Sequence, residues 1–166
     1  MVENVSRFKM GLVTDRLTYS SLIYEAMNHC LGPRIGSFRL SINTLDILFI
    51  ESAWQGHKNK WKFKIADYPD HPKRNNKSLI RLVEAAKKKG IPTVFWNKED
   101  GVHFDRFIDS AKHFDHIFTV DENCIPRYRE IVPCSTTVHA LPFPVQPRFH
   151  HFQPWEGGKT RANFVG

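Results

Sequence analysis

Apolar stretches of two kinds alternate along the chain, and this alternation constrains the fold more than any other feature of the sequence. Short runs typical of buried strands occur at residues 9–14, 45–50, 92–96, 116–120 and 137–141. Between them, apolar residues recur at helical spacing over residues 19–29, 78–89, 104–111 and 126–132. Strands separated by helices predict βαβ units with parallel strands. We therefore predict an α/β, Rossmann-like doubly wound domain with a mostly parallel sheet and helices on both faces.

Local signals set the expected limits of these elements. Thr18 is a suitable N-cap for the helix over residues 19–29, and Ser78 is a suitable first residue for the helix over residues 78–89. The run at residues 45–50 is almost continuously apolar, which is typical of a strand buried on both faces. Residues 52–76 form a long polar connection, and connections of that length are often functional.

The last part of the chain differs in composition from the rest. Four prolines and a Gly-Gly pair fall within residues 142–161, which is typical of a linker, and residues 162–166 look like the beginning of a strand. We therefore expect a Rossmann-like domain over residues 1–147. Over residues 148–166 we expect a linker and the first strand of a second domain.

Composition and missing motifs exclude several classes of protein. Apolar residues make up 41% of the 166 residues and charged residues 25%, a balance typical of folded proteins. No apolar run is long enough to cross a bilayer, and the first ten residues lack the apolar segment of a secretory signal. The three cysteines form no CxxC pair, so we expect reduced thiols in a cytoplasmic protein. The sequence contains neither a GxGxxG fingerprint nor a GxxxxGK[ST] loop, which argues against dinucleotide-binding proteins and P-loop NTPases.

Polar and aromatic residues gather where the predicted strands end. In a doubly wound sheet, ligands bind at the carboxyl ends of the strands. Carboxylates and amides there can bind the hydroxyls of a sugar, aromatic rings can stack on it, and a carboxylate can act as a general base. Such residues also commonly cap the following helix, and both interpretations stay open at this point. The candidates are Asp15, Glu51, Trp54, Asn97, Lys98, Glu99, Asp100, Asp121, Glu122 and Asn123.

Nine histidines raise the question of a metal site. They form neither an HExxH motif nor a Cys/His quartet, and their spacing distributes them over different elements. We predict no metal site.

Positive charge is concentrated in one window of the sequence. Residues 57–89 contain eleven Lys or Arg and only three acidic residues, whereas the whole chain carries a net charge of +7. A solvated face is the simpler interpretation of such a window. Lysines alternate with Trp61 and Phe63, however, in a pattern that can bind nucleic acid or an anionic membrane surface. A non-catalytic basic binding module for such a partner is therefore the alternative function.

Several segments resemble the CgeB-type spore-maturation glycosyltransferases. They are LFIESAWQG at residues 48–56, KIA at 64–66, the long run at 89–131 and ALPFPVQP at 140–147. The resemblance extends over about residues 10–166 and is most specific between residues 91 and 131. It implies the N-terminal, acceptor-side half of a GT-B glycosyltransferase, in which two Rossmann-like domains face each other across a cleft.

The resemblance also implies substrates and roles. The parent protein would transfer a sugar from a nucleotide-sugar, bound by the C-terminal domain, to a hydroxyl of a cell-surface glycan or polyol-phosphate precursor. The nucleotide-sugar is a co-substrate, and no metal or other cofactor is expected. Glu99 or Asp100 is the expected general base, and the other strand-end candidates would orient the acceptor. We expect the 166-residue chain to be inactive alone, cytoplasmic, and in peripheral contact with the inner membrane leaflet, with nucleic acid a less favoured partner.

Overall fold

A single parallel sheet organises the part of the chain that the computed structural model describes, residues 7–34, 36, 40 and 44–151. Six strands pair in the order β2-β1-β3-β4-β5-β6, and every neighbouring pair runs parallel. This arrangement confirms the predicted α/β, Rossmann-like fold class. The strands are β1 (Lys9–Val13), β2 (Met27–Cys30), β3 (Ile47–Glu51), β4 (Thr93–Asn97), β5 (His116–Thr119) and β6 (Thr137–Ala140).

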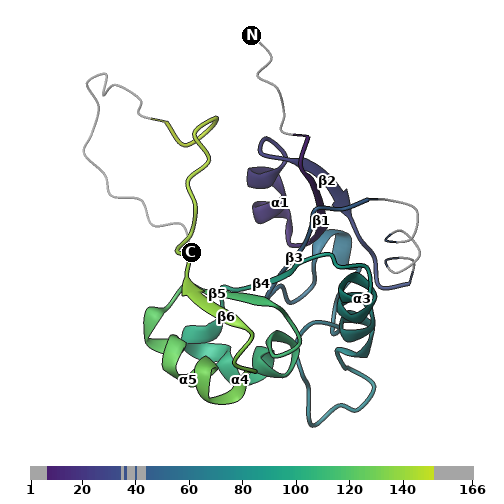
Figure 1. The fold of residues 1–166 in the computed structure, drawn as a ribbon, viewed down its shortest axis with the longest axis vertical. Coiled ribbons are helices and arrows are strands. Elements are labelled where there is room, and N and C mark those ends of the chain that lie inside the picture. Colours follow the sequence, from purple (N-terminus) through teal and green to yellow (C-terminus); the bar gives the residue numbers. More distant parts are fainter. Residues whose placement is uncertain (1–6, 35, 37–39, 41–43, 152–166) are drawn as a thin grey trace, which may run out of the picture.

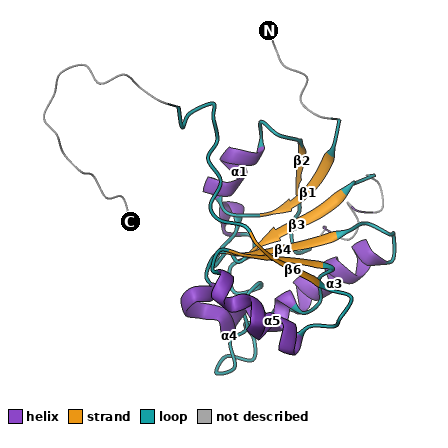
Figure 2. Ribbon diagram, turned by 60° about the vertical axis from the view of Figure 1, so that its left-hand side comes forward, coloured by secondary structure: helices purple, strands orange, loops and turns teal. Residues whose placement is uncertain are grey.

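Helices lie on both faces of this sheet (Figures 1 and 2). Helix α1 lies on one face, and α3, α4 and α5 lie together on the other. The main core fills the space between the sheet and the second group of helices, where Leu48, Phe95 and Ile117 pack against residues such as Leu79 and Phe107. The described helices are α1 (Arg16–Leu22), α3 (Lys77–Lys87), α4 (Asp100–Ala111) and α5 (Ile125–Ile131).

Alternation along the strands decides which side chains face which helices. On β3, Leu48 and Ile50 belong to the main core, whereas Phe49 points to the α1 face. The prediction that residues 45–50 are buried on both faces is correct for one face only. Phe49 is half-buried because α1 and the chain after β6 cover the other face incompletely.

The predicted helix over residues 19–29 is wrong in its second half. Helix α1 ends at Leu22, and residues 27–30 form the edge strand β2, whose Met27 N–H donates to the Phe8 carbonyl at 2.9 Å. Pairing with β1 decides the conformation of this segment, since MNHC has little strand propensity of its own. The N-cap is Asp15 rather than Thr18, because the Asp15 carboxylate accepts the Thr18 N–H at 2.9 Å.

Two other helices begin earlier than the sequence predicts. Helix α3 starts at Lys77, after Asn76, whose side chain turns away to Asp109 and Ser110 on α4 instead of capping the helix. Helix α4 starts at Asp100 and carries a local distortion at His103, so its first turn lies immediately after the polar residues at the end of β4.

The long connection over residues 52–76 is anchored by one aromatic side chain. Trp61 is fully buried, and its indole N–H donates to the Leu31 carbonyl at 2.8 Å. Gly56 adopts a φ of 64°, and a Cβ at this position would come within 2.9 Å of the Trp61 Cβ. Glycine is therefore required at this turn.

The strand order reverses between β1 and β3. From β1 the chain goes to β2 on one side and then crosses to β3 on the other. The connections leaving β1 and β3 therefore diverge, and such a topological switch point is where open α/β sheets bind their ligands.

The segment after β6 returns across the α1 face (Figure 1). Gln146 in this segment is buried, and its Nε2 donates to the Ser21 carbonyl at 2.7 Å and to Glu25 Oε1 at 2.8 Å. Residues 141–150 are thereby attached to the end of α1. Most of the predicted linker and the predicted strand at residues 162–166 lie outside the described residues. No helix in the described part of the chain is both long and apolar enough to cross a bilayer.

Candidate functional site

Three of the predicted residues meet at the switch point and form what we call the strand-end cluster: Asp15, Glu51 and Lys98. They come from the carboxyl ends of β1, β3 and β4. The Lys98 ammonium lies 2.9 Å from Asp15 Oδ2 and 3.1 Å from Glu51 Oε2, and donates to Thr18 Oγ1 at 3.2 Å. The prediction that polar strand ends converge therefore holds for these residues.

Backbone groups hold the cluster in place. The Asp15 N–H donates to Glu51 Oε1, so the end of β1 is hydrogen-bonded to the last residue of β3. The Lys98 N–H donates to the Ser52 hydroxyl at 2.7 Å, which joins the end of β4 to β3 in the same way. The Asp15 carboxylate has two roles. Its Oδ1 caps α1 by accepting the Thr18 N–H, and its Oδ2 accepts a hydrogen bond from the Lys98 ammonium.

Burial and charge act against each other within the cluster. Burial raises the pKa of Glu51 to about 6, although the Lys98 charge works to lower it. Burial also acts to raise the pKa of Asp15, but the hydrogen bonds from Thr18 and Lys98 outweigh it and hold that pKa below its usual value. For Lys98, burial lowers the pKa, and the charges and hydrogen bonds of Glu51 and Asp15 more than compensate, so the net shift is upward. The lysine is therefore a cation fixed between two carboxylates.

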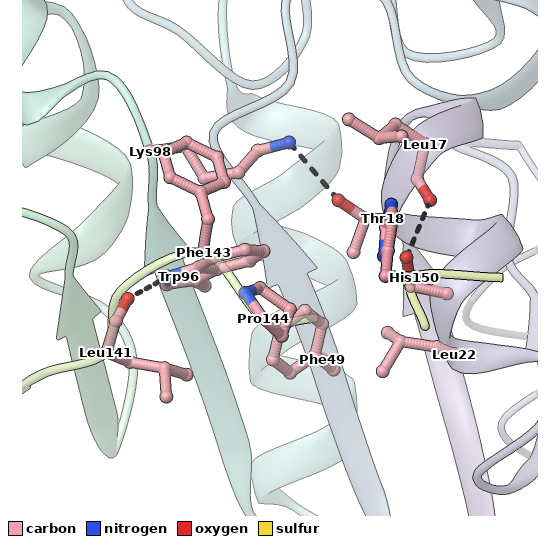
Figure 3. Close-up of a pocket in the computed structure, with 11 residues that line it drawn as sticks. Leu17, Thr18, Leu22, Phe49, Trp96, Lys98, Leu141, Phe143, Pro144 and His150 are labelled. Carbon is pink, nitrogen blue, oxygen red and sulfur yellow. Dashed lines mark hydrogen bonds between the residues drawn. The ribbon is translucent and has the colours of Figure 1, made fainter. Parts of the chain in front are cut away.

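A cavity of about 330 Å³ opens beside the cluster on the α1 face. Figure 3 shows Lys98 extending across its upper part toward Thr18, with Trp96 and Phe143 at one wall and Leu22 at the other. The Trp96 and Phe143 rings are 5.7 Å apart between centroids and nearly perpendicular, and the Trp96 indole N–H donates to the Leu141 carbonyl at 3.0 Å. We call this cavity the aromatic pocket. Its lining residues are Leu17, Thr18, Ser21, Leu22, Phe49, Trp96, Lys98, Leu141, Phe143, Pro144 and His150.

Asn97 and Asp100 lie on the other side of the sheet from this pocket. Because successive strand residues point to opposite faces, Asn97 faces α5 while Trp96 faces α1. The Asn97 amide donates to the Tyr128 hydroxyl at 2.7 Å, and that hydroxyl donates to Asp100 Oδ2 at 3.3 Å. Asp100 is only 1% exposed, and burial raises its pKa above the usual value. Both residues therefore belong to a buried network that joins α4 and α5.

The remaining predicted residues surround the start of α4. Trp54 packs edge-on against His103 and Phe107, each at 5.1 Å between ring centroids. Asp121 caps the short turn that follows β5 by accepting the Asn123 N–H at 3.0 Å, while Glu122 and Asn123 are exposed. The predicted residues are thus divided between the strand-end cluster and the neighbourhood of α4, and do not line one cavity together.

Glu99 differs from its neighbour Asp100. It directly follows Lys98 and is half-buried, and its carboxylate forms no hydrogen bond or ion pair with another described residue. Of the predicted pair, Glu99 is the carboxylate that remains accessible to a substrate.

Sequence reasoning missed the aromatic walls of the pocket. Phe49 and Trp96 read as ordinary strand residues, and Phe143 lies in a segment assigned to a linker. The alternation of β3 and β4 could have placed Phe49 and Trp96 on one face, but only the path of the chain after β6 brings Phe143 to them.

Among the described residues, no group of three or more His, Cys, Asp or Glu side chains is arranged to hold a metal ion. Comparison of the chain with protein-family models, curated proteins and solved structures found no match in any of the three.

Proposed function

We propose that the chain is the acceptor-binding part of a GT-B glycosyltransferase. The enzyme would transfer a sugar from a nucleotide-sugar, held by a second domain, to a hydroxyl of a cell-surface glycan or polyol-phosphate precursor. The observation that carries this proposal is the aromatic pocket beside the strand-end cluster, at the switch point of a parallel sheet. The resemblance to the CgeB-type glycosyltransferases supports the same activity. Such an enzyme would be cytoplasmic and in peripheral contact with the inner membrane leaflet.

The pocket has the composition that a sugar ring requires. The Phe143 ring, which is 60% exposed and packs on the buried Trp96 ring, offers apolar surface to the C–H face of a sugar, and polar groups at the rim can bind its hydroxyls. His150 is one of these groups, because its Nδ1 accepts the Gln146 N–H at 3.1 Å, which leaves the Nε2 of the neutral ring as a donor. The volume of about 330 Å³ is within the range of small-molecule sites.

Charge compensation favours a neutral group in this pocket. With Glu51 ionised, the strand-end cluster carries one net negative charge, although it contains a lysine. A phosphate would be repelled by both carboxylates, whereas hydroxyls can donate to Asp15, whose side chain is 41% exposed. We assign Lys98 a positioning role, since it holds Asp15 and Glu51 together.

The acceptor hydroxyl must lose a proton during transfer, and Glu99 is the proposed base. The new bond forms between the acceptor oxygen and the anomeric carbon, the bond to the nucleotide phosphate breaks, and the proton moves to the Glu99 carboxylate. Asp100 is less suited to this step, because it is buried against Tyr128. We assign Asp100 a role in holding the first turn of α4 that carries Glu99.

The test is sugar transfer by the protein with its donor-binding domain, from nucleotide-sugars to glycan and polyol-phosphate acceptors. Glu99→Gln is expected to lower kcat by about 100-fold, the usual order of effect for removing a general base, with little change in KM. Glu122→Gln is the matched control, because Glu122 is exposed and, unlike Glu99, does not adjoin a residue that lines the pocket. Full turnover by Glu99→Gln would remove Glu99 from the mechanism, and absence of any transfer by the unchanged protein would contradict the proposed activity.

A further inference from the structure

A second concave site lies on the opposite side of the sheet, beside α3. It is a groove of about 440 Å³ lined by Pro33, Arg34, Lys64, Ser78 and Arg81. These residues come from three separate segments: the chain after β2, the long connection after β3, and α3 itself. Helix α3 packs its apolar side into the main core, on the face of the sheet opposite α1 (Figure 2). The groove beside α3 and the aromatic pocket beside α1 are therefore on different faces. We call it the basic groove.

The three cations of the groove have no ion-pair partner among the residues that the structure describes. None of the described carboxylates forms an ion pair with Arg34, Lys64 or Arg81. The acids that are close in sequence do not compensate them. Asp67 accepts the backbone N–H of Tyr68, and Glu84, one turn further along α3, is exposed and forms no ion pair with Arg81. Three like charges therefore share one groove.

Some other cations of the described chain are compensated. Lys87, Lys112 and Arg127 each lie within 3.1 Å of an aspartate. Within the basic window itself, the Lys62 ammonium and the Arg74 guanidinium lie over the Phe63 ring, 5.1 Å and 4.1 Å from its centroid. Lysines without an ion pair to another described residue, such as Lys88 and Lys89, also occur elsewhere on the surface. The groove is thus distinguished by the convergence of three such unpaired cations on one concave site.

Hydrogen bonding inside the groove orients one of these cations. Arg81 Nη2 donates to the Ser78 hydroxyl at 3.3 Å. That hydroxyl keeps its own proton available to donate, and the guanidinium keeps further N–H groups for a planar, two-point contact. The described lining of the groove offers guanidinium, ammonium and hydroxyl donors without a carboxylate among them. This set of donors suits the oxygens of a phosphate group.

We propose that the basic groove is a binding site for a phosphate-bearing ligand, and that a diphosphate matches its three cations best. A diphosphate offers several negative charges along a short chain of oxygens, so it can contact Arg34, Lys64 and Arg81 together. The described lining of the groove includes neither an aromatic ring nor a carboxylate, which separates its ligand class from that of the aromatic pocket. This inference does not depend on the proposed transferase activity.

The test uses the 166-residue chain with inorganic pyrophosphate and inorganic phosphate as probes in titration calorimetry. We expect saturable binding of pyrophosphate, and weaker binding of phosphate. The double variant Lys64→Gln/Arg81→Gln is expected to weaken pyrophosphate binding at least about tenfold, because it removes two donors of charge-assisted hydrogen bonds. The matched control Lys88→Gln/Lys89→Gln removes the same net charge at the other end of α3.

Two outcomes would overturn the proposal. Absence of pyrophosphate binding would do so, and so would an equal loss of affinity in the groove variant and the control, because that result indicates only an effect of net charge.

A third arm distinguishes a free phosphate from a lipid headgroup: vesicles of phosphatidylcholine with phosphatidic acid are titrated with and without pyrophosphate. Competition between the two supports a shared phosphate site, whereas vesicle binding that pyrophosphate does not displace counts against the groove.

Discussion

Lysine has opposite surroundings in the strand-end cluster and in the basic groove. Only 9% of the Lys98 side chain is exposed, and its ammonium contacts two carboxylates and a hydroxyl. Lys64 is half-exposed and shares its groove with two arginines and no carboxylate. The difference indicates that Lys98 satisfies the protein's own charges, whereas the cations of the groove are left for a ligand.

Desolvation explains why the two regions must differ. A buried ammonium is tolerated only where carboxylates and hydrogen bonds replace water, and the ends of β1, β3 and β4 supply them to Lys98. The basic groove stays open to solvent, so its cations need no internal partner. The same substitution at Lys98 and at Lys64 tests this contrast directly.

The largest expected effect comes from removing the buried lysine. Lys98→Met keeps the length of the side chain but leaves Asp15 and Glu51 without their cation. We expect the free energy of unfolding at pH 7 to fall by about 3 kcal/mol, because breaking a buried ion pair leaves uncompensated charge. Lys64→Met is the matched control and should change it by less than about 0.5 kcal/mol, as is usual for a surface position. Urea unfolding of the three proteins measures both values, and equal effects at the two lysines would contradict the distinction.

A smaller effect concerns the pH dependence of stability at Glu51. Its pKa in the fold is about 6, above the ordinary value of 4.5, so the fold favours the protonated carboxyl. The resulting stabilisation is complete below pH 4.5 and is lost as the pH rises toward 6, with a total of about 2 kcal/mol. Glu51→Gln has no such titration. Relative to this variant, the unchanged chain should therefore lose about 2 kcal/mol of unfolding free energy across that pH window.

Urea titrations at about pH 4, 5, 6 and 7 measure the unfolding free energies that check this prediction. These pH values extend across the window that the pKa shift of Glu51 defines. The pKa of Asp15 is held below its ordinary value of 3.8 in the unchanged chain, so this carboxylate titrates below the pH range compared. A constant difference between the two proteins over the whole range would show that Glu51 does not titrate as its burial implies.

The sequence predicted the sheet better than it predicted the site. Five of the six strands are apolar runs that periodicity identifies, whereas β2 depends on pairing with β1 and has no signal of its own. The convergence of Asp15, Glu51 and Lys98 follows from parallel topology alone. Asn97 and Lys98 point to opposite faces of the sheet, as strand alternation requires. This could be predicted only once the limits of β4 are known. The basic groove needed the fold, since Arg34, Lys64 and Arg81 are far apart in sequence and Arg34 lies outside the basic window.

The central claim, that the aromatic pocket binds the acceptor sugar, is tested most directly by the tryptophan indole N–H signals in a nitrogen-15 NMR spectrum. Trp96 lies in the wall of the pocket, while Trp61 is buried to the same extent in the main core and serves as the internal control. Neutral glycan fragments are expected to shift the Trp96 signal and leave that of Trp61 unchanged. Phe143→Ala should weaken this binding about three- to tenfold, in line with one lost aromatic contact, and Ile131→Ala on α5 should not. A Trp96 signal that no glycan moves, or binding that Phe143→Ala leaves unaltered, would contradict the account.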